Sequence, residues 1–217
     1  QQRSSNQKLV FQTGIQGGSW WTNGASRDVM QASLNETANY GFFAIAAGNG
    51  GPGGGFTSEV NYRDSVSGLA QAERTNGNIA SIGALKATGT EVVDGLTNPT
   101  GVDLAGYSNR GSNLTLVGTT DTKSISGDGV INTFGGTSCA NPNVAAVAAL
   151  VWSKNTRLNG SELRDILTSS AMDLGSAGRD NTFGFGLVNA EAAMRRAYAL
   201  DQNQELANFW SVNEFLA

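Results

Sequence analysis

Two short strings place a serine and an asparagine where acyl-transfer chemistry would need them. The first, GGTSCANPNVAAVAALVWS, carries Ser138 directly before a strongly apolar stretch with helical character. At a helix N-terminus the backbone N–H groups and the macrodipole favour negative charge, so an oxyanion that develops beside Ser138 would be stabilised. Small neighbours let a substrate backbone approach closely, and they are Gly135, Gly136 and Ala140. The string therefore predicts a rigidly held nucleophile.

The second string, AIAAGNGG, places Asn49 shortly after the apolar run 42–47. A short continuous apolar run is typical of a parallel strand that is buried on both faces. Active sites of open α/β folds lie at the carboxyl ends of such strands. An asparagine amide there can donate to a tetrahedral intermediate, and losing such a donor typically costs about 10²–10³ in rate. Asn49 is therefore the candidate oxyanion donor.

Both strings resemble motifs of the subtilase family of serine proteases. Gly-Thr-Ser followed by a small residue, Pro and an Ala-rich helix resembles the nucleophile motif. The string AIAAGNGG resembles the oxyanion strand, with Gly50 and Gly51 closest to the kexin-like pattern. The resemblance covers roughly residues 42–197 and implies Ser138 as nucleophile and Asn49 as oxyanion donor. It also implies that one wall of the S1 pocket is formed by Ala46, Ala47 and Gly48.

Three residues depart from the family's nucleophile motif. Cys139 stands where Met is usual, Asn141 precedes the proline, and Asn143 occupies a position that is usually His. None of them is a family catalytic residue. Cys139 is either a second reactive group or redox switch, or a small buried side chain that fills the methionine site, which we favour. Residues 1–41 match the family only in outline, and GGSW at 17–20 is the candidate counterpart of its substrate-pairing strand.

Both site residues also have ordinary structural explanations. Ser138 could simply cap its helix, and Asn49 could occupy a left-handed turn at the end of its strand. The string GNGGPGGG could bind phosphate, but it lacks the Lys-Ser/Thr of such loops. The string GTSCA also resembles the nucleophile elbow of α/β-hydrolases, but those enzymes place a histidine after the serine, and none follows here.

The 217 residues contain no histidine, which is the commonest general base. Subtilases order their triad Asp, His, Ser, so we expect the Asp and His to come from a separate N-terminal fragment or chain. The sequence opens with QQRSSNQK, without Met or a signal-peptide core, which favours a chain made by cleavage or one half of a two-chain enzyme. Such a chain would be nearly inactive on its own.

Two further hypotheses compete with a subtilase endopeptidase. One is a catalytically inactive pseudoprotease that uses the fold for binding or assembly. The other is a sedolisin-like enzyme, with Glu in place of His. The Gly-Asn at residues 48–49 disfavours the sedolisin hypothesis, because an Asp is expected at that position.

Strands and helices must alternate along the chain to position these residues. Apolar patterns predict strands at 8–15, 42–47, 79–85, 114–117 and 185–188, and helices at 26–40, 142–152, 161–171 and 189–200. The alternation predicts an α/β sheet covered by helices. The resemblance implies a three-layer, mostly parallel twisted sheet with helices on both faces, incomplete without an N-terminal part. We expect residues 1–200 to form the C-terminal portion of the catalytic domain and residues 201–217 to form a tail. We also expect Pro142 in the first turn of its helix, and Asn159 or Ser161 as the cap of the helix that follows.

Composition excludes several other classes of protein. With 217 residues, 39% hydrophobic and 29 glycines, the chain suits one sizeable core with many tight turns. The basic residues are scattered along the sequence and the net charge is −4, so the sequence has no basic cluster of the kind that binds nucleic acid. No apolar run approaches a membrane span. The single cysteine excludes an internal disulfide framework and a Cys-rich metal site.

Acyl-enzyme chemistry requires no cofactor and no catalytic metal. Structural calcium is an option in the loops that hold Glu59, Asp64 and Asp103, although no spacing specifies a calcium loop and solvated surface acids are the simpler interpretation. The expected partners are the N-terminal fragment and a peptide or protein substrate of open specificity. The resemblance to subtilases implies that the protein is secreted or lies in an extracytoplasmic compartment. Glycosylation sequons begin at Asn35, Asn113 and Asn159.

Overall fold

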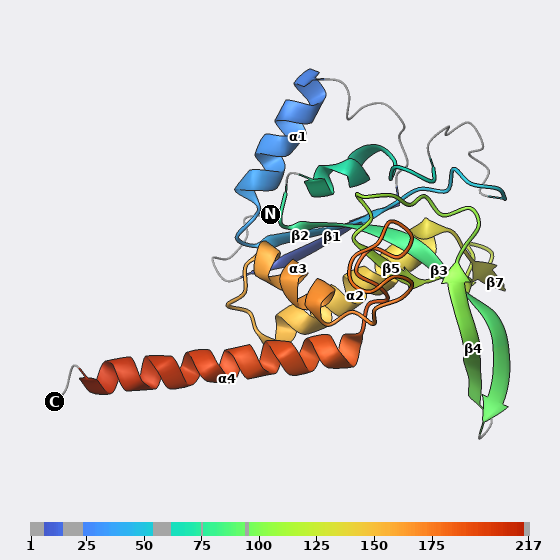
Figure 1. Cartoon of the computed structure of the whole chain (residues 1–217). Coiled ribbons are helices and arrows are strands. Elements are labelled where there is room, and N and C mark those ends of the chain that lie inside the picture. The colour runs from blue at the N-terminus through green and yellow to red at the C-terminus, as the bar shows by residue number, and fades with distance from the viewer. Residues whose placement is uncertain (1–6, 15–23, 54–61, 75, 94–95, 215–217) are drawn as a thin grey trace.

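A mostly parallel sheet forms the centre of the molecule (Figure 1). The computed structural model describes residues 7–14, 24–53, 62–74, 76–93 and 96–214. Strands β1 (Leu9–Thr13), β2 (Gly41–Ala46), β3 (Ile79–Val93) and β5 (Leu116–Thr119) lie parallel to one another in that order. Strand β4 (Leu96–Leu104) pairs antiparallel with β3. The second half of β3 therefore leaves the sheet with β4 as a two-stranded ribbon (Figure 1).

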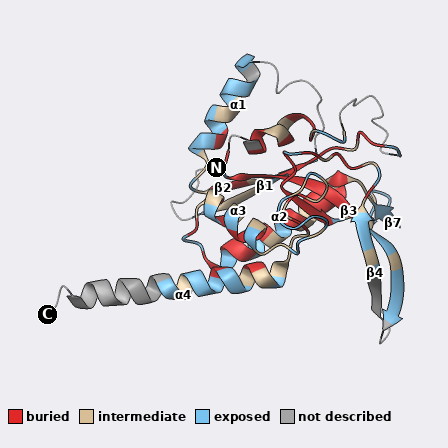
Figure 2. Ribbon diagram, viewed as in Figure 1, coloured by how far each residue is buried: buried red, intermediate tan, exposed pale blue. Residues whose placement is uncertain are grey.

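Helices cover both faces of this sheet. Helix α1 (Gly24–Glu36) and the 3₁₀ segment η2 (Gly68–Arg74) lie on one face, and α2 (Thr137–Lys154), α3 (Gly160–Ser169) and α4 (Ala190–Glu214) lie on the other. Alternate residues of β2 pack into opposite cores: Phe42 and Ala44 contact the side of α2 and α3, whereas Ile45 contacts the side of α1 and η2. Figure 2 shows this centre as the buried part of the molecule. The predicted three-layer α/β architecture is confirmed.

Several element boundaries differ from the sequence prediction. Helix α2 begins at Thr137, so Pro142 lies inside the helix rather than in its first turn. Residues 185–188 form no strand and contribute only isolated bridges, in which Leu187 pairs with Val117 and with Met172. The final helix begins after Asn189 as predicted but runs to Glu214 instead of ending near residue 200. The ribbon strand β4 and the hairpin of β6 (Thr122–Ile125) and β7 (Ile131–Phe134) were not predicted.

Two helix caps follow the predicted chemistry. The Asn159 side chain accepts hydrogen bonds from the backbone N–H groups of Ser161 and Glu162, both at 2.9 Å. The Glu162 carboxylate accepts in return from the Asn159 N–H at 2.8 Å, which completes a capping box. Asn159, and not Ser161, is therefore the cap of α3. At the start of α4, the Asn189 side chain accepts from the Ala192 N–H at 3.0 Å.

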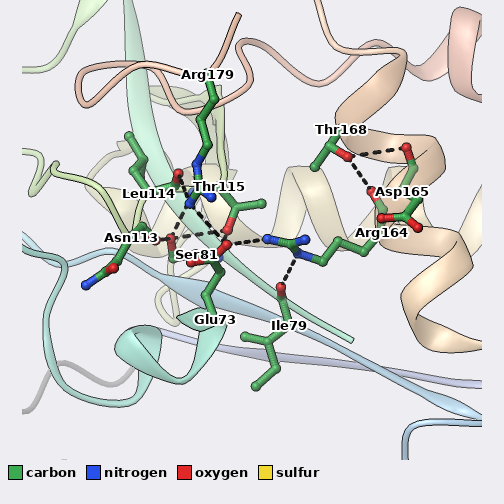
Figure 3. Close-up of polar contacts among 10 residues, drawn as sticks. All are labelled: Glu73, Ile79, Ser81, Asn113, Leu114, Thr115, Arg164, Asp165, Thr168 and Arg179. Carbon is green, nitrogen blue, oxygen red and sulfur yellow. Dashed lines mark hydrogen bonds and ion pairs between the residues drawn. The ribbon is translucent and has the colours of Figure 1, made fainter. Parts of the chain in front are cut away.

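A buried carboxylate joins η2 to the opposite side of the sheet (Figure 3). Glu73 is 8% exposed, and it pairs with Arg164 of α3 and with Arg179, whose Nη2 lies 3.0 Å from Glu73 Oε1. The Arg164 Nε also donates to the Ile79 carbonyl at 2.7 Å, and Arg179 donates to the Leu114 carbonyl at 3.1 Å. Burial lowers the pKa of the Arg164 guanidinium, and the Glu73 carboxylate acts in the opposite direction. The cluster ties η2 to α3 and to the segment before α4.

Candidate active site

Ser138 is the second residue of α2 and is half-buried. Gly136 is the N-cap residue of this helix, and no side chain makes a capping hydrogen bond there. Ser138 therefore does not cap the helix, and this structural explanation is wrong. Because Pro142 has no N–H, it cannot donate the usual helical hydrogen bond to the Ser138 carbonyl. The Ser138 carbonyl therefore lacks its usual intrahelical donor.

The end of β1 lies directly against the Ser138 side chain. A Cβ atom added to Gly14 would lie 2.9 Å from Ser138 Oγ, so only a glycine fits at this position without a shift of the serine. Residues 17–20, the candidate counterpart of the family's substrate-pairing strand, lie outside the described residues. The close approach of Gly14 was not predicted, because a lone glycine after a strand gives no signal of what it will contact.

Asn49 is fixed by the residue that precedes Ser138. The Thr137 N–H and the Thr137 hydroxyl both donate to Asn49 Oδ1, each at 2.9 Å, and the Gly48 N–H donates to Thr137 Oγ1 at 3.2 Å. Because a backbone N–H can only donate, the oxygen of the Asn49 amide must face Thr137. The Asn49 Nδ2 lies on the other side of the amide, 3.2 Å from where a Cβ of Gly136 would stand.

This geometry brings the two sequence candidates together. Asn49 follows β2 by three residues, Ser138 belongs to α2, and Thr137 joins them at the N-terminus of the helix. Asn49 does not adopt a left-handed conformation, since Asp121 is the only non-glycine residue with positive φ in the described part of the chain. The turn explanation of Asn49 is therefore wrong. An amide whose oxygen is held by Thr137 and whose Nδ2 lies beside the helix N-terminus suits stabilisation of an oxyanion near Ser138.

The predicted pocket wall, Ala46, Ala47 and Gly48, is buried. Ser67 supports it from behind, because the Ser67 N–H and hydroxyl both donate to the Ala47 carbonyl at 2.7 Å. Gly48 has φ 107°, and a Cβ there would lie 1.8 Å from Ser67 Oγ, so glycine is required. The Asn109 side chain donates to Ser67 Oγ at 3.1 Å and accepts from the Gly50 N–H at 2.7 Å. Neither Ser67 nor Asn109 was predicted, because their partners are distant in sequence.

The three departures from the family motif each have a defined environment. Cys139 is 1% exposed and contacts the Thr122 hydroxyl, with 3.1 Å between Sγ and Oγ1, as a small buried side chain should. Asn143 Nδ2 donates to the Thr119 carbonyl at 2.9 Å. Asn141 Nδ2 donates to the Thr13 carbonyl at 2.9 Å. Its Oδ1 is buried and has no hydrogen-bond partner in the part of the chain that the structure describes.

The acidic residues considered for calcium do not form a site in the described ranges. Glu59 lies outside those ranges, and neither Asp64 nor Asp103 belongs to a group of three or more described His, Cys, Asp or Glu side chains. The residues that the structure describes therefore do not fit a carboxylate-rich calcium site. Within the same residues, no helix is both long enough and apolar enough to cross a membrane.

Comparison with known proteins adds an independent line of evidence. The model of the subtilase family matches residues 12–186. Alkaline elastase YaB of Bacillus sp. (strain YaB) is 33% identical over 166 residues, which are 75% of this chain and 43% of that protein. Subtilisin BL of Lederbergia lenta is 32% identical over 152 residues, or 70% of this chain and 55% of that protein. The chain thus spans about half the length of these curated relatives.

Two further comparisons concern location and fold. Minor extracellular protease Epr of Bacillus subtilis (strain 168) is 30% identical over 173 residues, or 79% of this chain and 23% of that protein. The solved structure of Sphericase superposes with a TM-score of 0.61 at 21% identity and covers 84% of this chain and 57% of its own. At this identity the structural likeness shows the fold alone, and it agrees with the parallel, helix-covered sheet described above.

Proposed function

Because the chain belongs to the subtilase family of serine proteases, we propose that it is the C-terminal portion of an endopeptidase that cleaves peptide bonds through an acyl-enzyme on Ser138. The observation that carries the proposal is the double hydrogen bond from Thr137 to Asn49. It holds an amide donor beside the helix N-terminus that presents Ser138. The kexin-like character of the glycines after Asn49 stays a prediction.

The proposed reaction assigns each atom a role. Ser138 Oγ attacks the carbonyl carbon of the scissile bond while its proton passes to an imidazole. The resulting oxyanion accepts hydrogen bonds from Asn49 Nδ2 and from the Ser138 backbone N–H. Collapse of this intermediate breaks the C–N bond, and the departing amine takes the proton from the imidazolium. Water then hydrolyses the ester by the same steps, and Ser138 Oγ regains its proton. The side chain before the scissile bond would lie along Ala46, Ala47 and Gly48.

The imidazole and its aspartate must come from outside these 217 residues, which contain no histidine. We propose that an N-terminal segment or partner chain supplies them and docks beside β1. Among the described strands, β1 pairs with β2 alone, so its outer edge can accept another strand. A groove of about 400 Å³ lies at the same edge and is lined by Lys8, Val10, Ala149, Trp152, Ser153 and Thr156.

The buried Asn141 amide supports the same docking position. Its Nδ2 bonds β1 through the Thr13 carbonyl, and its Oδ1 is the buried acceptor that has no partner in the described residues. A buried carbonyl oxygen without a donor is costly, about 1–3 kcal/mol. A donor from the docked segment would satisfy it, three residues after Ser138 in the chain.

The absence of histidine from these residues also favours a second candidate, a pseudoprotease that keeps the fold for binding or assembly. Activity separates the two. The complete protein that contains this chain should hydrolyse a casein or fluorogenic peptide substrate, and Ser138→Ala should abolish hydrolysis. Ser161→Ala is the matched control, since Ser161 lies in the first turn of α3 but away from the site. Full folding without hydrolysis by the wild-type protein would support the pseudoprotease instead.

Compartment and calcium dependence are also proposals. One similar protein carries the word extracellular in its name, which supports secretion of this one. Recovery of the protein from culture medium or from a washed extracytoplasmic fraction tests this. Structural calcium, which the described acids do not explain, predicts a lower melting temperature after chelation with EDTA and its recovery on adding Ca²⁺. The acyl-enzyme chemistry itself requires no cofactor.

A further inference from the structure

The backbone at Gly136 adopts a conformation that only glycine tolerates. Its φ is 83° and its ψ is 172°, in a region that residues with a side chain essentially avoid. Gly136 is the N-cap residue of α2 and precedes Thr137 and Ser138. Its dihedral angles therefore set the direction in which the chain enters the helix. A small rotation here would move the Ser138 N–H and the anchor of Asn49 together.

Two hydroxyl groups hold Gly136 in this conformation. The Gly136 N–H donates to Tyr107 Oη at 3.0 Å, and Thr120 Oγ1 donates to the Gly136 carbonyl at 3.0 Å. The two hydroxyl oxygens lie 3.2 Å apart. Because the single hydroxyl hydrogen of Thr120 goes to the carbonyl, the Tyr107 hydroxyl must donate to Thr120 Oγ1. The result is a closed ring of hydrogen bonds that starts and ends on Gly136.

Tyr107 also holds the segment that carries Asn49. Its backbone carbonyl accepts a hydrogen bond from the Gly51 N–H at 3.0 Å. Thr120 is anchored in turn, because its N–H donates to the Leu85 carbonyl of β3 at 3.0 Å. The ring therefore connects the Asn49 loop, the nucleophile helix and the central sheet. Each member comes from a different part of the chain.

We propose that Tyr107 and Thr120 are positioning residues for the oxyanion hole. They fix Gly136 so that the Ser138 N–H and the Asn49 amide point at one oxygen atom. Neither hydroxyl needs to touch the substrate. This inference rests on the proposed protease function. Since the oxyanion exists only in the intermediate and the adjoining transition states, misplacement of its donors lowers kcat and leaves substrate binding largely intact.

Two substitutions remove one hydroxyl each and keep the shape of the side chain. In the complete protein, Tyr107→Phe and Thr120→Val should each lower kcat by about 10-fold or more while KM changes by less than about 2-fold. Thr120→Ser, which keeps the hydroxyl, should restore most of kcat. The double variant should be little worse than either single one, because both break the same ring. Tyr198→Phe is the matched control: Tyr198 is 47% exposed on α4 and should leave kcat unchanged.

The outcomes separate this inference from the proposed function. An inactive wild-type protein would remove the protease proposal and, with it, the role given to the ring. An active wild-type protein with unchanged kcat in Tyr107→Phe would overturn the inference alone. Equal losses in Thr120→Val and Thr120→Ser would overturn it too. Rates are expressed per folded molecule, from the melting curve of each variant, so partial unfolding is not counted as lost positioning. If Tyr107→Phe yields no folded protein, Thr120→Ser and Thr120→Val are compared instead. Equal kcat values for these two variants would contradict the inference.

Discussion

Thr137 and Asn49 are joined by two hydrogen bonds although 88 residues separate them in sequence: the Thr137 N–H and hydroxyl both donate to Asn49 Oδ1 at 2.9 Å. Thr137 immediately precedes Ser138, so the side chain that would bind the oxyanion is tied to the residue next to the proposed nucleophile. The amide cannot turn over without losing both bonds. This pair is the structural basis for the preorganised oxyanion hole that we propose.

Removing the Thr137 hydroxyl should loosen the Asn49 amide without removing it. Thr137→Val keeps the size of the side chain and one of the two bonds to Asn49 Oδ1, the one from the backbone N–H. We expect kcat to fall by about 10-fold, since a donor that is less well held stabilises the oxyanion less. Thr137→Ser should retain most of kcat. Steady-state hydrolysis of a peptide substrate by the complete protein measures both, and equal rates for Val and Thr would contradict the role of the hydroxyl.

Removing the Asn49 amide should cost more than removing its anchor. Asn49→Ala is expected to lower kcat by about 10²–10³ with a much smaller effect on KM, as for loss of an oxyanion donor elsewhere. If Thr137 acts only through Asn49, then Thr137→Val should have little further effect in the Asn49→Ala background. Additive losses in the double variant would show that Thr137 acts by another route.

Gly48 should not tolerate a side chain, for two separable reasons. Its φ is 107°, and an added Cβ would lie 1.8 Å from Ser67 Oγ. Positive φ alone costs about 1–3 kcal/mol for a residue with a side chain. Gly129→Ala is the control, because Gly129 has φ 80° and no atom within 4 Å of the added Cβ.

Urea unfolding of the Gly48 and Gly129 variants measures the difference. Gly48→Ala should be clearly less stable than Gly129→Ala, and Ser67→Gly should recover part of that difference by removing the clash. Equal destabilisation of the two alanine variants would contradict the close packing of Ser67 against the pocket wall.

The Glu73 carboxylate should stabilise the fold because its removal leaves the buried Arg164 guanidinium without its counter-charge. Glu73→Leu is expected to cost about 3–5 kcal/mol, and the additional change Arg164→Met should recover much of it. Glu191→Ala is the control, since the exposed Glu191–Arg195 pair should contribute no more than about 0.5 kcal/mol. A double variant as unstable as the sum of the two single changes would contradict this explanation.

The pH dependence of this cluster has a definite sign. Burial lowers the pKa of Arg164 in the folded protein below its unfolded value, so folding is penalised while Arg164 is protonated. That penalty is relieved only as pH rises through the lowered pKa. By its own titration Arg164 therefore adds no stability on acidification, and acid unfolding that depends on Arg164 in the Glu73→Leu background would contradict this assignment.

The groove beside β1 should be the contact surface for the segment that we propose supplies the triad Asp and His. Ala149 is exposed on α2 and lines the groove, so Ala149→Arg should weaken retention of that segment. Val92→Arg is the control, because Val92 is 70% exposed on the β3–β4 ribbon, away from the groove. Copurification followed by mass spectrometry measures retention. Equal retention in both variants would place the contact elsewhere.

Local patterns in the sequence were enough to predict much of this structure. The apolar run after Ser138 predicts α2, and the cap candidates Asn159 and Ser161 predict the start of α3, because each depends on neighbours within a few residues. Asn49 lies three residues after a buried strand, which the run 42–47 predicts. The start of α2 was misjudged, because Pro142 is tolerated inside a helix whose first turn is held by tertiary contacts.

What could not be predicted depends on residues that are far apart in the chain. The β3–β4 ribbon follows from a fifteen-residue strand that changes partners along its length, and no local pattern marks where the change occurs. The hydroxyl ring around Gly136 joins residues 16 and 29 positions away. The support of Ala47 by Ser67 is similarly non-local. Such contacts are fixed by tertiary packing rather than by propensity.

Covalent labelling of Ser138 tests the central claim most directly. The complete protein that contains this chain is treated with a fluorophosphonate probe, digested and analysed by mass spectrometry. We predict one modified serine, Ser138, labelled much faster than Ser161 at the start of α3, with labelling strongly slowed in Asn49→Ala and absent in Ser138→Ala. A folded protein that leaves Ser138 unlabelled, or labels it no faster than Ser161, would contradict the assignment of Ser138 as an activated nucleophile.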